Sequence, residues 1–205
     1  MAITYPLDLP AELVTRGMRF RAVSAVGVSA SPFTGAQQVY SHAGETWALD
    51  FDLPPMKRAD AEPCVAFLLA LNGREGIFVA GDPLNTSPRG TWAGSPLVNG
   101  AHAAGVKTVV LDGFTAAATG KAGDWIQFAT GASRRLHKVV QDFTADGSGN
   151  ATIEIWPRTR AALANNDAFV TSSPKGIFRL ASNVREWSIE IAQLYGLQFS
   201  AVDAL

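Results

Sequence analysis

Residues 47–53 read WALDFDL, and this stretch decides the fold. Large apolar residues occupy every odd position, and small or acidic residues occupy every even position. A period of two is typical of a β-strand with one buried face. Pro54 and Pro55 follow directly. Because proline cannot donate to a β-ladder, we expect the strand to end there.

The segment after this strand, from Ala59 to Asn72, predicts a helix. Asp60 and Glu62 suit the positive end of a helix, and Pro63 is tolerated in a first turn. An apolar stripe at three- and four-residue spacing is expected to lie on the sheet. Its members are Val65, Phe67, Leu68, Leu69, Leu71 and Asn72.

Strands from both ends of the chain are expected to complete this first sheet. Short β-rich runs occupy residues 18–23, 25–28 and 76–81 near the start. Residues 176–180 and 184–191 form two more near the end, the second alternating around Trp187. We therefore predict one split domain, formed by residues 1–89 and 173–205.

The middle of the chain has a different rhythm. An irregular Gly/Pro-rich passage leads into short predicted strands with glycine turns between them, at residues 108–111, 124–128, 135–140 and 151–156. Residues 145–150 predict a hairpin loop. Such spacing is typical of a small β-barrel, which we place at residues 90–172, inserted into the first domain. The predicted fold class is therefore mainly β, with one flanking α-helix.

The composition points to a covered surface. Hydrophobic residues make up 47% of the chain and charged residues 17%, against roughly 25% charged in an average soluble domain. Five Trp and eleven Phe add large apolar area. A chain with so little charge is expected to hide part of its surface against partner subunits, so self-association is the first hypothesis.

The charge and hydropathy patterns exclude other partners. The net charge is −1 and no long run of Lys or Arg occurs, so we expect no specific nucleic-acid binding. The first residues lack the basic and apolar segments of a secretion signal, which predicts synthesis in the cytoplasm. No apolar run reaches the roughly 20 residues that cross a bilayer, so we expect no membrane insertion.

Residue types that could carry catalysis occur without a productive pattern. Cys64, the single cysteine, lies in the apolar helix, where a buried thiol is common. His42, His102 and His137 have spacings that match no zinc motif, and no Gly-x-Ser-x-Gly elbow is present. We predict that the chain is not an enzyme and has no catalytic, metal or cofactor site.

Two groups of oxygen ligands leave alternatives open. Asp142, Asp146 and Asn150 surround a glycine-rich loop and loosely suggest calcium, although a solvated hairpin is favoured because their spacing is not that of a calcium loop. Asp50 and Asp52 share one strand face, as the carboxylates of a glycosidase would. A wall hydrolase using these residues or Glu190 is the enzymatic alternative, and an exposed strand face is the favoured interpretation.

The tryptophans suggest a binding alternative. Trp125, Trp156 and Trp187 lie in predicted strands, where core packing is expected. Trp92 lies in a Gly/Ser/Pro-rich loop and is the candidate for an exposed contact. A glycan-binding module of a tail tip or adhesin, in which Trp92 stacks on a sugar, is therefore the alternative function.

Several stretches together resemble one protein family. Residues 31–40 (SPFTGAQQVY), the strand at Trp47, residues 53–56 (LPPM) and the following helix resemble the opening of siphophage tail-tip proteins. Later stretches resemble distal tail or minor tail proteins of phages and prophages. These are residues 121–128 (KAGDWIQF), 151–157 (ATIEIWP) and 179–183 (RLASN). The resemblance covers nearly the whole chain.

This resemblance implies a structural virion protein at the tip of a long phage tail. The family forms a ring, expected to be a homo-hexamer, on a domain similar to the tail-tube β-sandwich with its flanking helix. The ring joins the tail tube protein to the tail-tip hub protein, and a tail fibre is a further partner that the family allows. The resemblance implies no cofactor.

A ring subunit needs two different surface patches that meet in the next copy. The candidate is the segment from residue 29 to residue 40, where Phe33 and Tyr40 stand among turn-forming residues. Gln37 and Gln38 lie in the same segment and complete the predicted subunit interface. A loop that covers its own core would have a similar sequence.

Overall fold

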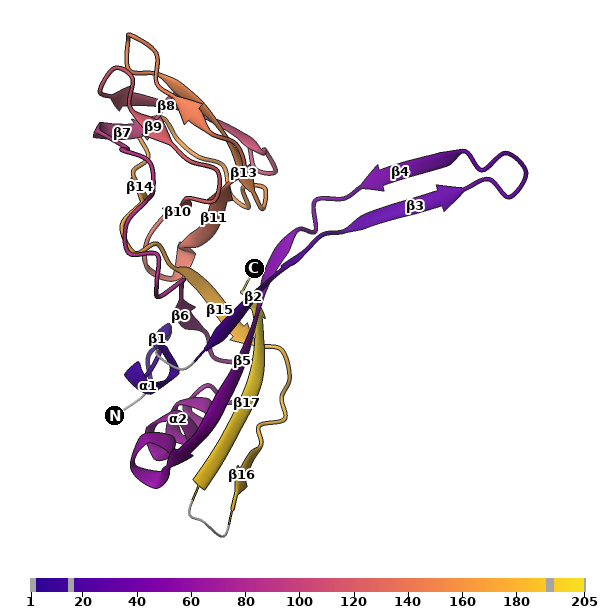
Figure 1. Ribbon diagram of the computed structural model, residues 1–205, viewed down its shortest axis with the longest axis vertical. Helices are drawn as coiled ribbons and strands as arrows, with labels where there is room; N and C mark the ends of the chain where they lie inside the picture. The colour runs from indigo at the N-terminus through magenta and orange to yellow at the C-terminus, as the bar shows by residue number, and fades with distance from the viewer. Residues whose placement is uncertain (1–2, 15–16, 191–193, 205) are drawn as a thin grey trace.

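The computed structural model describes residues 3–14, 17–190 and 194–204. The fold is mainly β, as predicted, and its described helices are α1 (Ala11–Val14), α2 (Arg58–Ala70) and the 3-10 turn η1 (Gly131–Ser133). Figure 1 shows a first sheet with both α-helices in the lower half, a second sheet above, and a hairpin projecting sideways from between them.

The first sheet combines strands from both ends of the chain. Its order is β1-β6-β15-β17-β5-β2. Strand β16 pairs with the same edge of β17 as β15 does, farther along that strand. The strands are β1 (Leu7–Asp8), β2 (Met18–Val23), β5 (Thr46–Lys57), β6 (Phe78–Ala80), β15 (Gly176–Leu180), β16 (Trp187–Ile189) and β17 (Leu194–Asp203). All pairs are antiparallel except β1 with β6.

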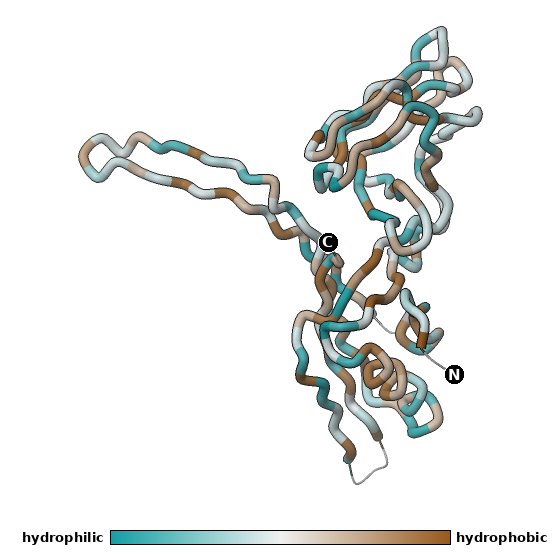
Figure 2. Tube along the Cα trace, turned by 180° about the vertical axis from the view of Figure 1, so that it is seen from behind, coloured by the Kyte–Doolittle hydropathy of each residue, from teal (hydrophilic) through white to brown (hydrophobic). Residues whose placement is uncertain are grey.

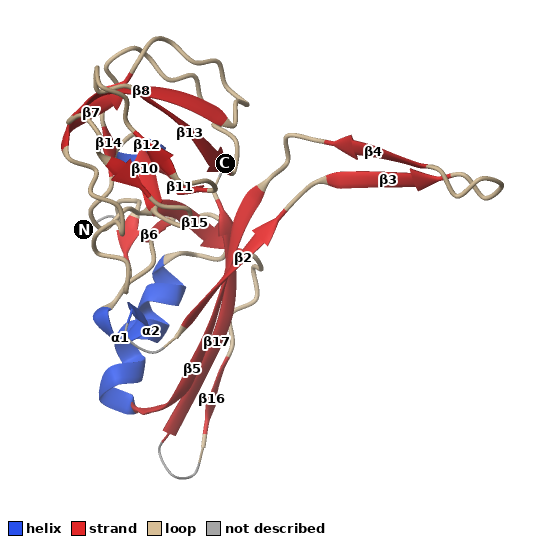
Figure 3. Ribbon diagram, turned by 45° about the horizontal axis from the view of Figure 1, so that its top comes forward, coloured by secondary structure: helices blue, strands red, loops and turns tan. Residues whose placement is uncertain are grey.

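The alternation in β5 predicts its buried face correctly. Trp47, Leu49, Phe51 and Leu53 are all buried in the core of this sheet, on the side that α2 covers (Figure 3). The predicted end of the strand is wrong, because β5 continues through Pro54 and Pro55 to Lys57. Past Phe51 the strand pairs only with β17, and the pairing is irregular there, so a missing N–H costs little.

Helix α2 is confirmed with different details. It begins at Arg58, which places Pro63 in the second turn. The buried face is carried by Ala61, Cys64, Val65, Phe67, Leu68 and Leu71. Leu69 is 52% exposed, so its predicted place in the stripe is wrong. The helix ends at Ala70, and Asn72 and Gly73 follow with positive φ.

The end of the chain differs most from the prediction. The expected strand at residues 184–191 is reduced to β16, and Ile191 lies outside the described residues. Trp187 is 36% exposed rather than a core residue, because β16 is an edge strand with little packed over it. The central strand is instead β17, which the sequence interpretation missed.

The second sheet has the order β14-β10-β11-β13-β8-β7, and β9 pairs separately with β12. The strands are β7 (Gly94–Val98), β8 (Thr108–Phe114), β9 (Thr119–Gly120), β10 (Trp125–Phe128), β11 (Arg135–Val139), β12 (Phe143–Thr144), β13 (Ala151–Trp156) and β14 (Phe169–Val170). The sheet nearly closes into a barrel, because Val98 exchanges backbone hydrogen bonds with residues 166–167, just before β14.

The two sheets meet at an aromatic cluster. Trp47 of β5 lies 4.9 Å from Trp125 and 4.3 Å from Trp156, measured between ring centroids. Its indole Nε1 donates to the Leu136 carbonyl at 3.0 Å. Strands of the second sheet thus contribute to the core of the first, and the domain boundaries at residues 89/90 and 172/173 stay predictions.

Candidate interaction surface

A β-hairpin projects from the body of the molecule, and we call residues 26–41 the arm. Its strands are β3 (Val26–Ala30) and β4 (Gln37–Ser41), paired from Val26 with Ser41 to Ala30 with Gln37. A turn at residues 31–36 closes it, where Ser31 Oγ accepts the N–H groups of Phe33 and Thr34 at 3.3 Å. In Figures 1 and 2 the arm extends free of every other drawn segment.

The arm is exposed on both faces. From residue 26 to residue 44 only Ser31 is half-buried, and every other residue is exposed. Phe33 at the tip is 95% exposed, and Val28 and Val39 are 60% and 62% exposed. An isolated two-stranded hairpin is marginally stable in water at best. The arm therefore has no core of its own to hold it.

The arm also lacks charge. No Asp, Glu, Lys or Arg occurs between Arg21 and Glu45. Proteins usually protect a free strand edge with charged side chains, prolines or a covering element, because unpaired N–H and C=O groups recruit other strands. A long, uncharged, two-edged hairpin is the kind of surface that a partner covers.

The pairing register separates two faces on the arm. Residues directly opposite each other point to the same side of a hairpin. Val26, Val28 and Ala30 of β3 therefore share a face with Gln37, Val39 and Ser41 of β4. The other face carries Gly27 and Ser29 with Gln38 and Tyr40. One face is thus mainly apolar and the other mainly polar apart from Tyr40.

The predicted interface residues all lie on the arm and are exposed, but the structure does not bring them together on one face. Phe33 is in the tip loop, Gln37 is on the apolar face, and Gln38 and Tyr40 are on the other. The sequence interpretation missed Val26, Val28 and Val39. Their alternation with Gly27, Ser29 and Gln38 on the two strands was the available signal.

The root of the arm is held by cations of the second sheet. Glu45 is only 4% exposed, and Lys107 Nζ lies 2.7 Å from its Oε1. The Arg158 N–H donates to Glu45 Oε2 at 3.1 Å. Burial would raise the pKa of Glu45, but the hydrogen bonds from Lys107 and Arg158 outweigh it and hold the pKa below its ordinary value. Glu45 is therefore a buried, ionised and paired carboxylate.

Trp92 is buried, which corrects its prediction as an exposed contact. It is 7% exposed and packs edge-on against Phe143, with 5.0 Å between ring centroids. Its Nε1 donates at 2.9 Å to Asp124, which is fully buried. Small residues around Trp92 suggested a solvent-exposed loop, but this loop folds over the core of the second sheet. Little ring area is left for a sugar.

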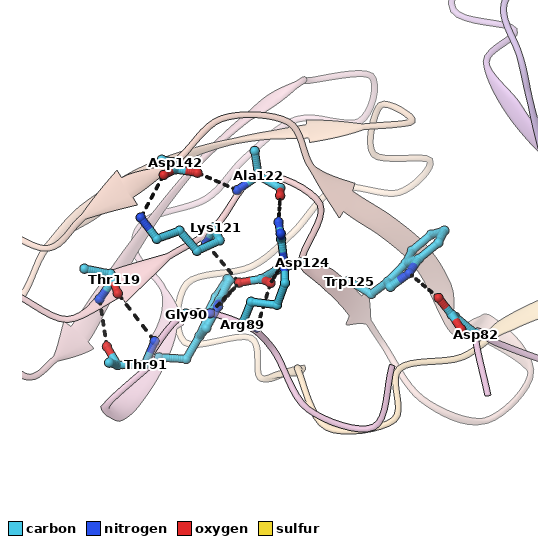
Figure 4. Close-up of polar contacts among 11 residues, drawn as sticks. Asp82, Arg89, Gly90, Thr91, Thr119, Lys121, Ala122, Asp124, Trp125 and Asp142 are labelled. Atoms are coloured by element: carbon cyan, nitrogen blue, oxygen red, sulfur yellow. Dashed lines mark hydrogen bonds and ion pairs between the residues drawn. The ribbon is translucent and has the colours of Figure 1, made fainter. Parts of the chain in front are cut away.

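Asp124 organises this loop. Its carboxylate accepts hydrogen bonds from the backbone N–H groups of Arg89, Gly90 and Lys121 in addition to the Trp92 indole, and Figure 4 shows the backbone contacts. Burial would raise the pKa of Asp124, but these four donors outweigh it and lower the pKa. A fully buried carboxylate that accepts four hydrogen bonds from its own chain is a structural anchor.

The cysteine and histidines lie in separate places. Cys64 is buried in α2, where its Sγ donates to the Asp60 carbonyl at 3.4 Å. His137 is buried in β11, with Nδ1 2.8 Å from the Pro157 carbonyl, and burial lowers its pKa to about 4. His102 Nε2 accepts the Val110 N–H at 3.3 Å, and His42 lies at the arm root.

The carboxylates considered for hydrolysis are engaged or separated. Asp50 pairs with Arg21, with 2.6 Å between Oδ2 and Nε, and accepts the Ser200 hydroxyl at 2.7 Å. The Ser200 hydrogen bond, helped by Arg21, lowers the pKa of Asp50, so this group is a poor proton donor at neutral pH. Asp52 lies on the same face, and Glu190 lies beyond β16, where its N–H donates to the Leu194 carbonyl.

The geometry does not support the calcium alternative. Asp142 binds Lys121 Nζ at 2.8 Å, and Asp146 Oδ1 accepts the N–H groups of Ser148 and Asn150 inside its own turn. Across the described residues, no group of three or more His, Cys, Asp or Glu side chains could hold a metal ion.

In the same part of the chain, no helix is long and apolar enough to cross a membrane.

No protein-family model and no curated protein matches the chain. The fold and the arm therefore define only a class: a mainly β protein with a free, uncharged β-hairpin.

Proposed function

We propose that the chain is a structural subunit that assembles with copies of itself into a ring at the distal end of a long phage tail. The arm carries this proposal, because it is long, uncharged and exposed on both faces. In a ring, the arm of one copy would lie on a different surface of the next, a heterologous contact that closes when the rotation allows it. Burying the apolar face of the arm would then stabilise the ring.

The finer assignments rest on the resemblance of the sequence. We propose that the first sheet with its helices corresponds to a tail-tube-like β-sandwich, and that the ring is a hexamer. Its proposed neighbours are the tail tube protein and the tail-tip hub protein, with a tail fibre as a further partner, in the virion tail tip. The low charge of the whole chain supports an assembled state, because much of its surface would be covered.

The first test removes the arm. The His42 N–H donates to the Ala25 carbonyl at 2.8 Å, so the chain ends at the arm root already meet. Replacing residues 26–41 by Asn-Gly closes them with a two-residue hairpin turn. We expect rings of the full chain in native mass spectrometry and negative-stain microscopy. The shortened chain should be monomeric and melt at nearly the same temperature.

A second variant keeps the arm and changes its apolar face. Val28 and Val39 are direct partners across the hairpin, so Val28→Lys with Val39→Glu places opposite charges side by side and preserves the pairing. We expect this pair to abolish the rings. Val184→Lys adds a charge at a 74% exposed valine outside the arm and should leave the rings intact. Rings that survive loss of the arm, or monomers of the full chain even with tail tube protein, would contradict the proposal.

A further inference from the structure

The arm joins the first sheet at an irregular joint. The pairing of β2 with β5 ends at Val23 opposite Thr46, and the pairing of β3 with β4 begins at Val26 opposite Ser41. Two residues therefore separate the paired segments on one strand and four on the other. Unequal strand lengths bend and twist a β-ladder, as in a bulge. The direction of the arm depends on how this joint is held.

Three cations of the second sheet bind the longer side of the joint. Arg160 Nη1 donates to the Ala43 carbonyl at 3.0 Å, and its Nη2 donates to the Glu45 carbonyl. Lys107 and Arg158 bind the Glu45 carboxylate, and Arg158 Nη2 contacts Ser41 Oγ at 3.4 Å. These contacts reach from the last residue of β4 to the residue before β5.

The cations themselves are held on rigid backbone. Lys107 precedes β8, and its carbonyl accepts the Ile155 N–H of β13 at 2.8 Å. Arg158 and Arg160 follow β13, and Thr159 between them donates its N–H to the Val106 carbonyl at 2.9 Å. Both segments are therefore tied to each other at the edge of a well-packed core. A cation placed in this way can restrain a neighbouring strand rather than follow it.

We infer that the second sheet sets the direction of the arm through three cations that flank its strands, Lys107, Arg158 and Arg160. These cations bind the Glu45 carboxylate and backbone carbonyls at the arm root, and we call this set of contacts the grip. This gives the second sheet a role in positioning the arm that needs no ligand. Its value for assembly rests on the proposed ring. The grip lies within a single chain, so the orientation of the arm and the formation of the ring can be tested separately.

The experiment measures the arm direction within one chain by single-molecule FRET. One dye is attached at Thr34→Cys on the arm tip and the other at Ser148→Cys on the second sheet, in a Cys64→Ala background. Both label sites are exposed. The unmodified grip should give a single narrow peak of transfer efficiency. Glu45→Gln, which keeps the shape and removes the charge, should broaden, split or shift that peak.

Two further variants guard against a folding defect in Glu45→Gln. Lys107→Met and Arg160→Met each remove one cation of the grip, and Lys107 is itself partly exposed, so a folded protein is expected. Both should also change the peak while the melting transition stays cooperative. Glu62→Gln is the matched control, because Glu62 forms an exposed pair with Arg58 on α2. It should leave the peak of transfer efficiency unchanged. A narrow, unshifted peak in every folded grip variant would overturn the inference.

Ring formation is then scored on the same variants. If the full chain forms rings, the grip variants should form fewer of them at equal concentration, and Glu62→Gln should not. If the full chain stays monomeric, the proposed ring fails while the FRET result still decides the grip. If the peaks change and ring yield does not, the grip orients the arm without serving assembly, and its proposed value for assembly is wrong.

Discussion

The arm and the second sheet are built from similar strands, but the apolar side chains are buried in the second sheet and exposed on the arm. Both contain antiparallel ladders in which aliphatic residues recur at alternate positions on one face. In the second sheet, Val109, Leu111, Ile153 and Ile155 are essentially without solvent contact. In the arm, Val28 and Val39 face water. A period of two shows which face of a strand is apolar. It does not show whether other segments of the same chain bury that face.

The strongest test of this difference is the loss of Trp92. Removing its buried indole opens a cavity and leaves Asp124 without a donor, so Trp92→Ala should lower the free energy of unfolding by about 3–5 kcal/mol. Urea unfolding followed by circular dichroism measures it. Trp187→Ala, at an exposed edge position, is the control and should cost well under half of that. Equal costs would mean that Trp92 is not part of a packed core.

The next effect is a pH dependence confined to the body of the molecule. Burial raises the pKa of Asp203 to about 6, against the pull of Arg135 and Arg160. Its folded form favours the proton, so its contribution to stability is full below the unfolded pKa and is lost as pH rises through 6. Burial lowers the pKa of His137 to about 4, so its contribution is full above the unfolded pKa and is lost as pH falls through 4.

These two slopes oppose each other between pH 4 and 6.5 and should nearly cancel in the unmodified chain. Asp203→Asn removes one of them. The variant should lose about 3 kcal/mol of unfolding free energy as the pH falls across this range, measured by urea unfolding at a series of pH values. Removing the arm should leave both curves unchanged, and an equally flat curve for Asp203→Asn would contradict the assignment.

The smallest effect is the sharpest comparison, because it uses one substitution in both regions. Val109→Thr places a hydroxyl in the core of the second sheet, where Val109 has no exposed surface, and should cost about 1–3 kcal/mol. Val28→Thr makes the same change on the arm and should stay within about 0.5 kcal/mol. Differential scanning calorimetry of the monomer compares the two. A similar cost at both positions would mean that the arm is packed against its own chain.

Local patterns were sufficient for most elements of the fold. The predicted strands at residues 151–156 and 176–180 have the bounds of β13 and β15, the strand predicted from residue 47 by its period of two begins one residue after the start of β5, and the helix was found within a few residues. The signal for β17 was also present, since Leu197, Phe199 and Ala201 alternate with Gln198 and Ser200. It was missed because the alternating run around Trp187 was interpreted as the strand that completes the sheet.

For the candidate surface, sequence reasoning found the segment and not its geometry. Phe33, Gln37, Gln38 and Tyr40 lie in one projecting segment, and which of them share a face depends on the β3–β4 register. Their role as a subunit interface stays a prediction. Trp92 was misjudged because Gly, Ser and Pro neighbours describe a loop and do not say whether the loop folds inward. The Glu45 grip joins residues more than fifty positions apart, and no local pattern could predict it.

The sequence alone determined the β-rich class, the single long helix and the absence of charge along the arm, because these depend on periodicity and residue type within a short window. The tertiary structure decided which apolar faces are covered, that Trp92 is buried and Trp187 exposed, and that the second sheet holds the arm root. Burial and pairing are set by distant segments, and their contacts exist only once the chain has folded.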